Sequence, residues 1–196
     1  QHPVHLYANP GTFTVTLDVT GPGGADAETQ TNLVVVNVAP TGRTLLPVAD
    51  SSVNQARPNA NAGSSTGLLV RSVAGGSFRS YLRFDLSGSS GPVTSAKLRF
   101  FCTDGSNVGG LLFRSPSTWA ENTITWNNKP AAAGAQIGAL GAVRTGTWVE
   151  VDVTSVLSAS SGPVSFLLTS TSSNTALYSS RESTRPPQLV ITTGLP

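Results

Sequence analysis

Short segments rich in Val, Thr, Leu and aromatic residues recur downstream of residue 42, and turn-forming residues separate them. The intervening stretches, such as 54–66 and 86–92, are rich in Gly, Pro, Asn and Ser. Many short strands at this spacing are typical of sandwiches and jelly rolls, so we predict an all-β jelly-roll domain over residues 41–196. The expected strands are 44–49, 67–73, 77–86, 93–102, 110–115, 122–126, 147–153, 164–170, 176–180 and 188–193, with one helical turn at 153–159 capped by Thr154 or Ser155.

The first 40 residues predict a separate β-hairpin. Apolar and polar residues alternate strictly from Thr12 to Thr20, which indicates a half-buried strand. Residues 21–26 read as a turn and 28–38 as a second, β-branched strand, followed by a linker at 39–42. Residues 1–40 carry a formal charge of −3 and residues 41–196 one of +5. This asymmetry indicates two pieces with different histories.

Histidine and cysteine usage argues against most enzyme classes. The two histidines, His2 and His5, lie at the amino end, so no imidazole is at hand for a nucleophilic triad or a zinc site. Paired-carboxylate chemistry stays open on this count, since Asp50, Asp85, Glu121, Glu150, Asp152 and Glu182 remain, but carboxylates scattered in this way are unspecific and an enzyme is not expected. The single cysteine, Cys102, ends an apolar strand and is expected to be a buried thiol.

No apolar run is long enough to span a membrane. A chain that starts at Gln1 is expected to be a mature or excised segment of a secreted protein.

Two families are suggested by particular motifs. The stretch YANPGTFTVTLDVTGPGG (7–24) resembles the carboxyl-terminal half of a PKD (polycystic kidney disease) domain, an immunoglobulin-like sandwich whose preceding strands are absent from residues 1–40. Residues 45–193 resemble a DNRLRE (disaggregatase-related) domain through SYLRFDLSG, VTSAKLRFF, STWAENTITWNNKPA, TWVEVDVTSVL and YSSRESTRPPQLVIT, in that order. The second resemblance implies a non-catalytic jelly-roll module of secreted bacterial and archaeal proteins, some of which bind acidic polysaccharides such as alginate.

Basic residues gather between positions 71 and 114. Alternation in 77–86 and 93–102 places basic and aromatic side chains on the face away from the core. If these strands are neighbours, the sheet presents a basic, aromatic surface suited to an anionic glycan, since Arg pairs with carboxylates and rings stack on sugars. The alternative is a solvated face with cross-strand salt bridges. A net charge of +2 argues against nucleic acid. The candidate ligand residues are Arg71, Arg79, Tyr81, Arg83, Lys97, Arg99 and Trp119.

Tryptophans and acidic residues offer further candidates. We expect Trp126 and Trp148 to close the ends of the core, whereas Trp119 fits either a core or a sugar-binding role. Jelly-roll modules often hold a structural Ca²⁺ through carboxylates and carbonyls. Asp50 and Asp152, at motif positions of the resembled family, are the candidate ligands; the alternative is that each caps a turn. Looser candidates are Asp104, Asn127 and Asn128.

A lone hairpin is marginal in water, so the amino-terminal piece needs a partner. It packs on the downstream domain, or it is cut from a longer chain, or another copy completes its sheet by strand addition. The last option predicts an extracellular structural or adhesive protein, a subunit of a self-assembling surface fibre. The alternative is a carbohydrate-binding module from a secreted polysaccharide-processing protein.

Overall fold

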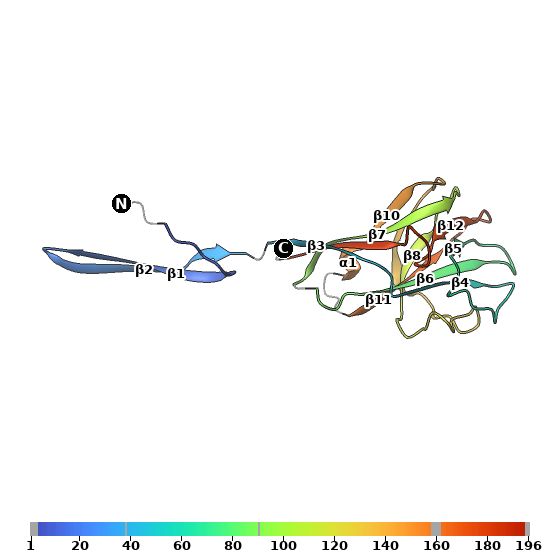
Figure 1. Ribbon diagram of the computed structural model, residues 1–196, viewed down its shortest axis with the longest axis horizontal. Coiled ribbons are helices and arrows are strands. Elements are labelled where there is room, and N and C mark those ends of the chain that lie inside the picture. Colours follow the sequence, from blue (N-terminus) through green and yellow to red (C-terminus); the bar gives the residue numbers. More distant parts are fainter. Residues whose placement is uncertain (1–3, 38, 90, 158–161, 195–196) are drawn as a thin grey trace. The chain divides into compact units, whose positions relative to one another are not determined.

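The computed structural model describes residues 4–37, 39–89, 91–157 and 162–194, and the chain forms two compact units. The smaller unit is Gln1–Pro40 and the larger one is Thr41–Gly194 (Figure 1). Nearly all regular structure is antiparallel β-strand, as predicted. Among the described residues, no helix has the length and apolar character that a membrane crossing requires.

The smaller unit is the predicted hairpin. Strands β1 (Gly11–Gly21) and β2 (Gly24–Val36) pair antiparallel through a two-residue turn, and a register shift lies between Phe13 and Val15. The apolar face of β1 is open rather than half-buried beyond this shift, because Leu17 and Val19 are 60% and 57% exposed.

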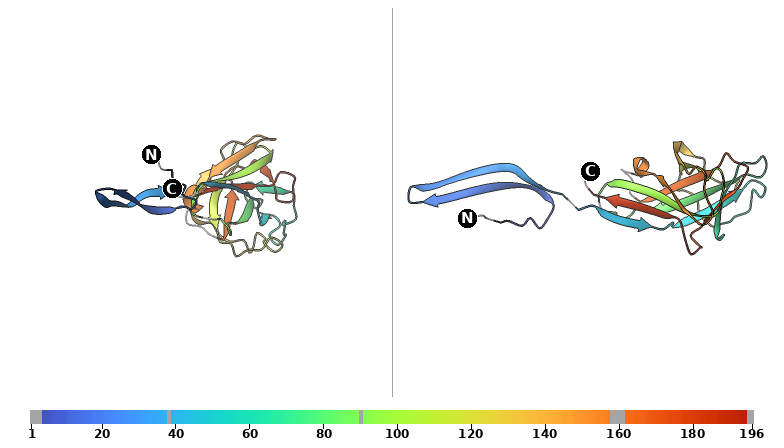
Figure 2. Two further views of the ribbon diagram at one scale, coloured as in Figure 1. Left: turned by 60° about the vertical axis from the view of Figure 1, so that its left-hand side comes forward. Right: turned by 90° about the horizontal axis from the view of Figure 1, so that it is seen from above.

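The larger unit is a sandwich of two antiparallel sheets that face each other (Figure 2). In the six-stranded sheet the order is β3-β13-β7-β12-β5. The sixth strand, β10, pairs with β7 on the edge opposite β13. In the five-stranded sheet the order is β4-β6-β11-β8-β9. The bounds are β3 Thr41–Leu45, β4 Ala49–Asn54, β5 Gly67–Val70, β6 Phe78–Asp85, β7 Val93–Asp104, β8 Leu111–Ser115, β9 Ala133–Ala139, β10 Trp148–Asp152, α1 Thr154–Leu157, β11 Pro163–Thr169, β12 Ala176–Ser179 and β13 Gln188–Thr193.

The main core fills the space between the two sheets. Leu82 of β6, Leu98 of β7 and Phe166 of β11 are fully buried there, as strand alternation requires. Tyr178 is buried in the same cluster, and its hydroxyl donates to the carbonyl of Gly109 at 2.6 Å. Cys102 is buried as predicted, and burial raises the pKa of its thiol.

A second, smaller core covers the outer face of the five-stranded sheet. The long segment 116–132 between β8 and β9 packs Trp119 and Ile124 onto Tyr81 and Leu167. This face of the sheet is therefore covered by the chain itself rather than left to solvent.

Two of the expected strands are wrong. The segment 44–49 is not one strand: β3 ends at Leu45 and β4 starts at Ala49 in the other sheet. Pro47 lies between them, where a residue without an N–H cannot continue a ladder. The segment 122–126 forms turns within 116–132 instead of a strand. Strands β4 and β9 are additional to the predicted set.

Candidate functional site

The basic residues predicted to share one surface belong to two different sheets. Arg79 and Arg83 lie on β6 in the five-stranded sheet, whereas Lys97 and Arg99 lie on β7 in the six-stranded sheet. The premise that these strands are neighbours is therefore wrong. Two separate basic regions exist in place of the single face.

Three of the predicted ligand residues hold segment 116–132 in place. Tyr81 is fully buried, contrary to its expected position on an open face, and its hydroxyl donates to the carbonyl of Pro130 at 2.7 Å. This burial raises the pKa of Tyr81 to about 12. The Nη1 group of Arg83 donates to the carbonyls of Ser117 and Trp119 at 3.1 and 2.6 Å. Trp119 is only 6% exposed, which places it in the second core.

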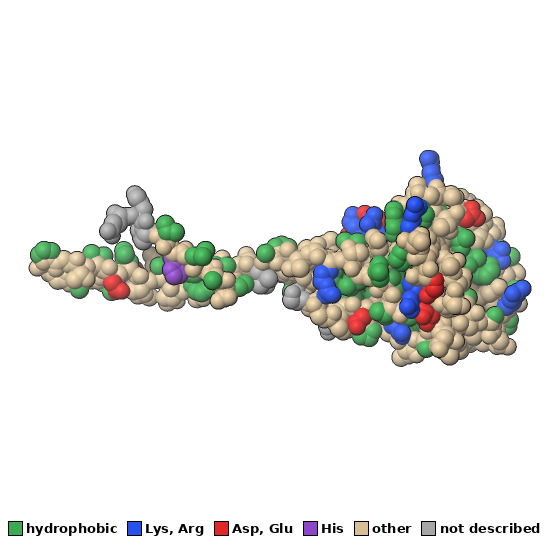
Figure 3. Space-filling model, in the orientation of Figure 1, with side chains coloured by type: hydrophobic (Ala, Val, Ile, Leu, Met, Phe, Trp, Pro, Cys, Tyr) green, Lys and Arg blue, Asp and Glu red, His purple; other side chains and the backbone are tan. Residues whose placement is uncertain are grey.

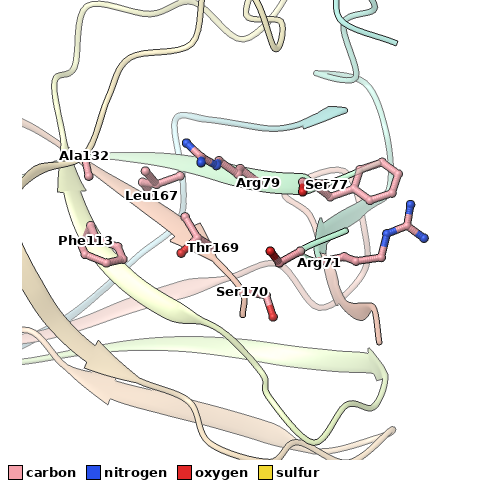
Figure 4. A pocket seen from close by; sticks show the side chains of 10 residues that line it. Arg71, Ser77, Arg79, Phe113, Ala132, Leu167, Thr169 and Ser170 are labelled. Carbon is pink, nitrogen blue, oxygen red and sulfur yellow. The ribbon is translucent and has the colours of Figure 1, made fainter. Parts of the chain in front are cut away.

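A pocket of about 250 Å³ opens on the same outer face, beside this second core. Strands β6, β8 and β11 supply its walls, together with residues just before β6 and after β11. Figure 4 shows Phe113 and Ala132 at one end, Arg71 at the other, and Arg79 and Thr169 between them. The lining mixes two guanidinium groups and several hydroxyls with apolar side chains: Arg71, Ser72, Ser77, Phe78, Arg79, Phe113, Ala132, Leu167, Thr169 and Ser170.

Aromatic rings contact both arginines of this pocket, and the carbonyl of Gly76 also holds Arg71 by accepting from its Nε and Nη2 at 3.1 and 2.7 Å. The guanidinium carbon of Arg71 lies 4.8 Å from the ring centre of Phe78, and that of Arg79 lies 5.3 Å from Trp126. Lys129 also lies on Trp126, at 3.8 Å, and its pKa is lowered by burial and by Arg79. Within the described part of the chain, none of these three cations has an ion pair. Unneutralised positive charge is therefore concentrated beside the pocket.

Trp126, predicted to close the core, is half-buried and packs against the second core. The prediction that Trp148 closes the core is wrong. Trp148 lies on β10 directly opposite Phe101 of β7, on the outer face of the six-stranded sheet, because its neighbours Val149 and Val151 take the inward positions.

The other basic region lies on this outer face and contains acidic residues as well. Lys97 forms an ion pair with Glu150, and the Nε of Arg99 lies 3.6 Å from the same carboxylate. Figure 3 shows basic, acidic and apolar side chains interspersed over the face of the larger unit that it presents. Lys97 and Arg99 therefore share a cross-strand salt bridge with Glu150, which was the alternative to a ligand role for these two residues, and one carboxylate balances only one of their two charges.

Asp50 lies in a cluster of three carboxylates. Ligand atoms of Asp50, Glu121 and Glu182 lie within 4.8 Å of one another, an arrangement that could hold a cation. The Arg181 side chain already brings positive charge to this cluster, because its Nη1 is 2.8 Å from Glu121 Oε2. The backbone N–H of Arg181 also donates a hydrogen bond to the Asp50 carboxylate at 2.8 Å. Burial raises the pKa of Asp50 to about 7, and repulsion from the two glutamates adds to this rise. Sequence reasoning missed both glutamates, although STWAENT and YSSRES, two quoted motifs, contain them.

The other metal candidates do not join this cluster. Asp152 is exposed and accepts a hydrogen bond from the Thr154 N–H at 2.8 Å, so it caps the turn before α1 and its pKa is lowered. Asn127 and Asn128 bond to neighbouring loop groups, Asn59 and Thr125. Asp104 is exposed at the end of β7.

Comparison with known families gives one match. The model of carbohydrate-binding module family 96 matches residues 41–193, which is well over half of the chain and covers the larger unit. No curated protein matches the chain.

Proposed function

The chain belongs to carbohydrate-binding module family 96, and from this premise we propose that the larger unit binds an acidic polysaccharide, such as alginate, in the Arg71–Arg79 pocket. The role is binding rather than catalysis. We further propose that the protein works outside the cell, where such polymers occur, as part of a secreted polysaccharide-processing protein.

The observation that carries this proposal is a pair of arginines that have no acidic partner in the described part of the chain, in a pocket that also offers hydroxyls. Guanidinium groups bind carboxylates through hydrogen bonds, and neither Arg71 nor Arg79 has an acidic partner among the described residues. Arg79 stacks on Trp126, whereas Arg71 stacks on Phe78 and also donates from Nε and Nη2 to the carbonyl of Gly76 at 3.1 and 2.7 Å, so Arg79 is the main carboxylate-binding group. Thr169 and Ser170 add groups that can bond to sugar hydroxyls, and Phe113 adds an apolar wall. A pocket of about 250 Å³ is smaller than most drug-sized sites, so we expect it to hold one unit of a longer chain.

Affinity electrophoresis in gels that contain alginate or a neutral glucan tests the proposal. The wild-type protein should be retarded by alginate and not by the glucan. Arg79→Ala should weaken binding at this pocket roughly 10- to 100-fold, the cost of losing a charge-assisted hydrogen-bonding group, and should reduce retardation by alginate accordingly. Arg144→Ala is the matched control, because Arg144 is exposed and removes the same charge outside the pocket. Equal retardation of both variants, with unchanged melting temperatures, would show that only net charge matters.

A second candidate function is self-assembly through the smaller unit, and the exposed hairpin favours it. Leu33 and Val35 of β2 are 54% and 62% exposed, in addition to the open residues of β1. Among the described residues neither edge of this two-stranded sheet is paired with another strand, which favours strand addition. The formal charge of −3 on residues 1–40 complements that of +5 on residues 41–196. We propose that the partner is a second copy, and that the PKD resemblance reflects a sandwich completed between copies to form a fibre.

Electron microscopy and light scattering of the full chain test this second candidate. Filaments or larger species should form at high concentration. They should disappear in Leu17→Asn, which makes the exposed face polar, and persist in Thr16→Asn, which changes the opposite face of β1. A full chain that stays strictly monomeric at high concentration overturns the fibre reading and leaves the glycan proposal intact.

A further inference from the structure

A row of stacked cations and rings lies on the outer face of the six-stranded sheet. The guanidinium carbon of Arg99 is 5.0 Å from the ring centre of Trp148, and that of Arg185 is 4.3 Å from Phe101. The two rings meet edge to face, with centres 5.5 Å apart. Strands β7 and β10 fix this contact, because Trp148 and Phe101 are direct cross-strand partners.

Each end of this row presents a cation in a defined orientation. Arg99 donates from Nη1 to the side-chain oxygen of Gln188 at 3.2 Å, in addition to its contact with Glu150. Glu150 serves Lys97 as well, and Asp152 is the cross-strand partner of Lys97 on β10, so this face carries two carboxylates against Lys97, Arg99 and Arg185. Arg185 is exposed and has no ion pair among the residues that the structure describes. Positive charge therefore exceeds negative charge along the row, and ring stacking leaves the outer N–H groups of Arg185 available.

We propose that this row is a second binding surface for carboxylate groups of an acidic polysaccharide, so that one molecule bridges two polymer chains. The inference rests on the proposed function, because it assumes the same class of ligand. A linear polyanion suits this surface because Arg185 has no acidic partner among the described residues and Arg99 shares its one partner, Glu150, with Lys97, while the charged groups of the polymer repeat along its chain.

The position of the row separates it from the Arg71–Arg79 pocket. The pocket lies on the outer face of the five-stranded sheet, and the row lies on the outer face of the six-stranded sheet. The main core fills the space between these sheets, so the two surfaces point away from each other. A short oligosaccharide cannot occupy both, and each surface should bind its own chain.

Calorimetry with a short alginate oligosaccharide tests the inference through the number of sites on the full chain. The wild-type protein should bind two oligosaccharides, Arg185→Ala one and Arg79→Ala one. Arg144→Ala should still bind two, because Arg144 belongs to neither surface. Arg185 is exposed and, among the described residues, stacks on the Phe101 ring without an ion pair, so its loss should leave the melting temperature unchanged.

Light scattering of long alginate chains gives an independent readout of bridging. Wild-type protein should produce large cross-linked particles, and either single variant should abolish them while binding persists. One site per molecule that is insensitive to Arg185→Ala and lost in Arg79→Ala overturns the inference and leaves the proposed function standing. An absence of binding to any acidic oligosaccharide overturns both.

Discussion

Replacement of the buried Asp50 by Asn should change how stability depends on pH. In the folded chain Asp50 is 1% exposed and lies beside Glu121 and Glu182, and its pKa is raised from 3.8 to about 7, chiefly by burial. The unfolded chain has no such environment, and there the carboxyl ionises near its ordinary value. A carboxyl that is neutral when folded contributes stability that is complete below about pH 4 and is lost as pH rises through about 7.

The magnitude follows from the two pKa values. Each pKa unit corresponds to about 1.4 kcal/mol, so a rise from 3.8 to about 7 corresponds to about 4 kcal/mol of unfolding free energy. Asn cannot ionise, and its side chain has nearly the same shape. The free energy of unfolding of Asp50→Asn, minus that of the wild type, should therefore increase by up to about 4 kcal/mol between about pH 4 and pH 8.

Urea unfolding followed by tryptophan fluorescence measures this difference at a series of pH values. Other titrating groups are common to both proteins and cancel in the subtraction. Curves that stay parallel to within about 1 kcal/mol would refute the reasoning, because the buried carboxylate would then be ionised and neutralised by Arg181. Added calcium provides a second arm: a cation held by the three carboxylates should restore stability to the wild type above about pH 7 and not to Asp50→Asn.

Three further predictions concern the covering segment and the core. Tyr81→Phe should lower the free energy of unfolding by about 1 kcal/mol, because one buried hydrogen bond is lost, and denaturant titration measures this change. Gly63→Ala should lower the melting temperature and Gly23→Ala should not, because a Cβ at Gly63 would lie 2.2 Å from the carbonyl oxygen of Glu121 whereas Gly23 faces open space. The Cys102 thiol should resist a thiol reagent in the native protein and react in denaturant, because it is fully buried and its pKa is raised. The absorbance of the released chromophore measures the reaction, and rapid labelling of the native protein would contradict the buried position of Cys102.

Alternation along the strands predicted much of the fold, because a sheet with one face on a core imposes a period of two. In 77–86 and 93–102 the positions that alternate with the basic residues include Leu82, Leu98 and Phe100, and all three are buried in the main core. The prediction of an exposed position failed for Tyr81. Alternation correctly puts this residue on the outer face of the sheet, but it does not predict that segment 116–132 covers that face. The sequence of segment 116–132 has no periodic pattern from which its packing onto the outer face of the sheet could be predicted.

The grouping of site residues was harder to predict than the strands. Arg79 and Arg99 come from strands that follow each other in sequence, yet a sandwich places β6 and β7 in different sheets. Pairing of this kind depends on long-range topology, which local patterns do not encode. The same limit applies to Asp50, whose neighbours Glu121 and Glu182 are more than 60 residues away in sequence. Their shared presence in the family motifs was the one available signal.

The sparse acids of the larger unit explain why its arginines suit a polyanion. Residues 41–196 carry all 12 basic residues and only seven acids, and Glu121, Glu150 and Glu182 are already in ion pairs. The remaining cations are oriented mainly by rings. A carboxylate partner would occupy the N–H groups of a guanidinium, whereas a ring contacts its flat face and leaves the N–H edges to solvent. Arg79 and Arg185 both have this arrangement, on opposite faces of the sandwich. Neither has an acidic partner among the described residues, so both can receive carboxylates from outside the protein, which is the chemical requirement of the acidic-polysaccharide binding proposed for this module.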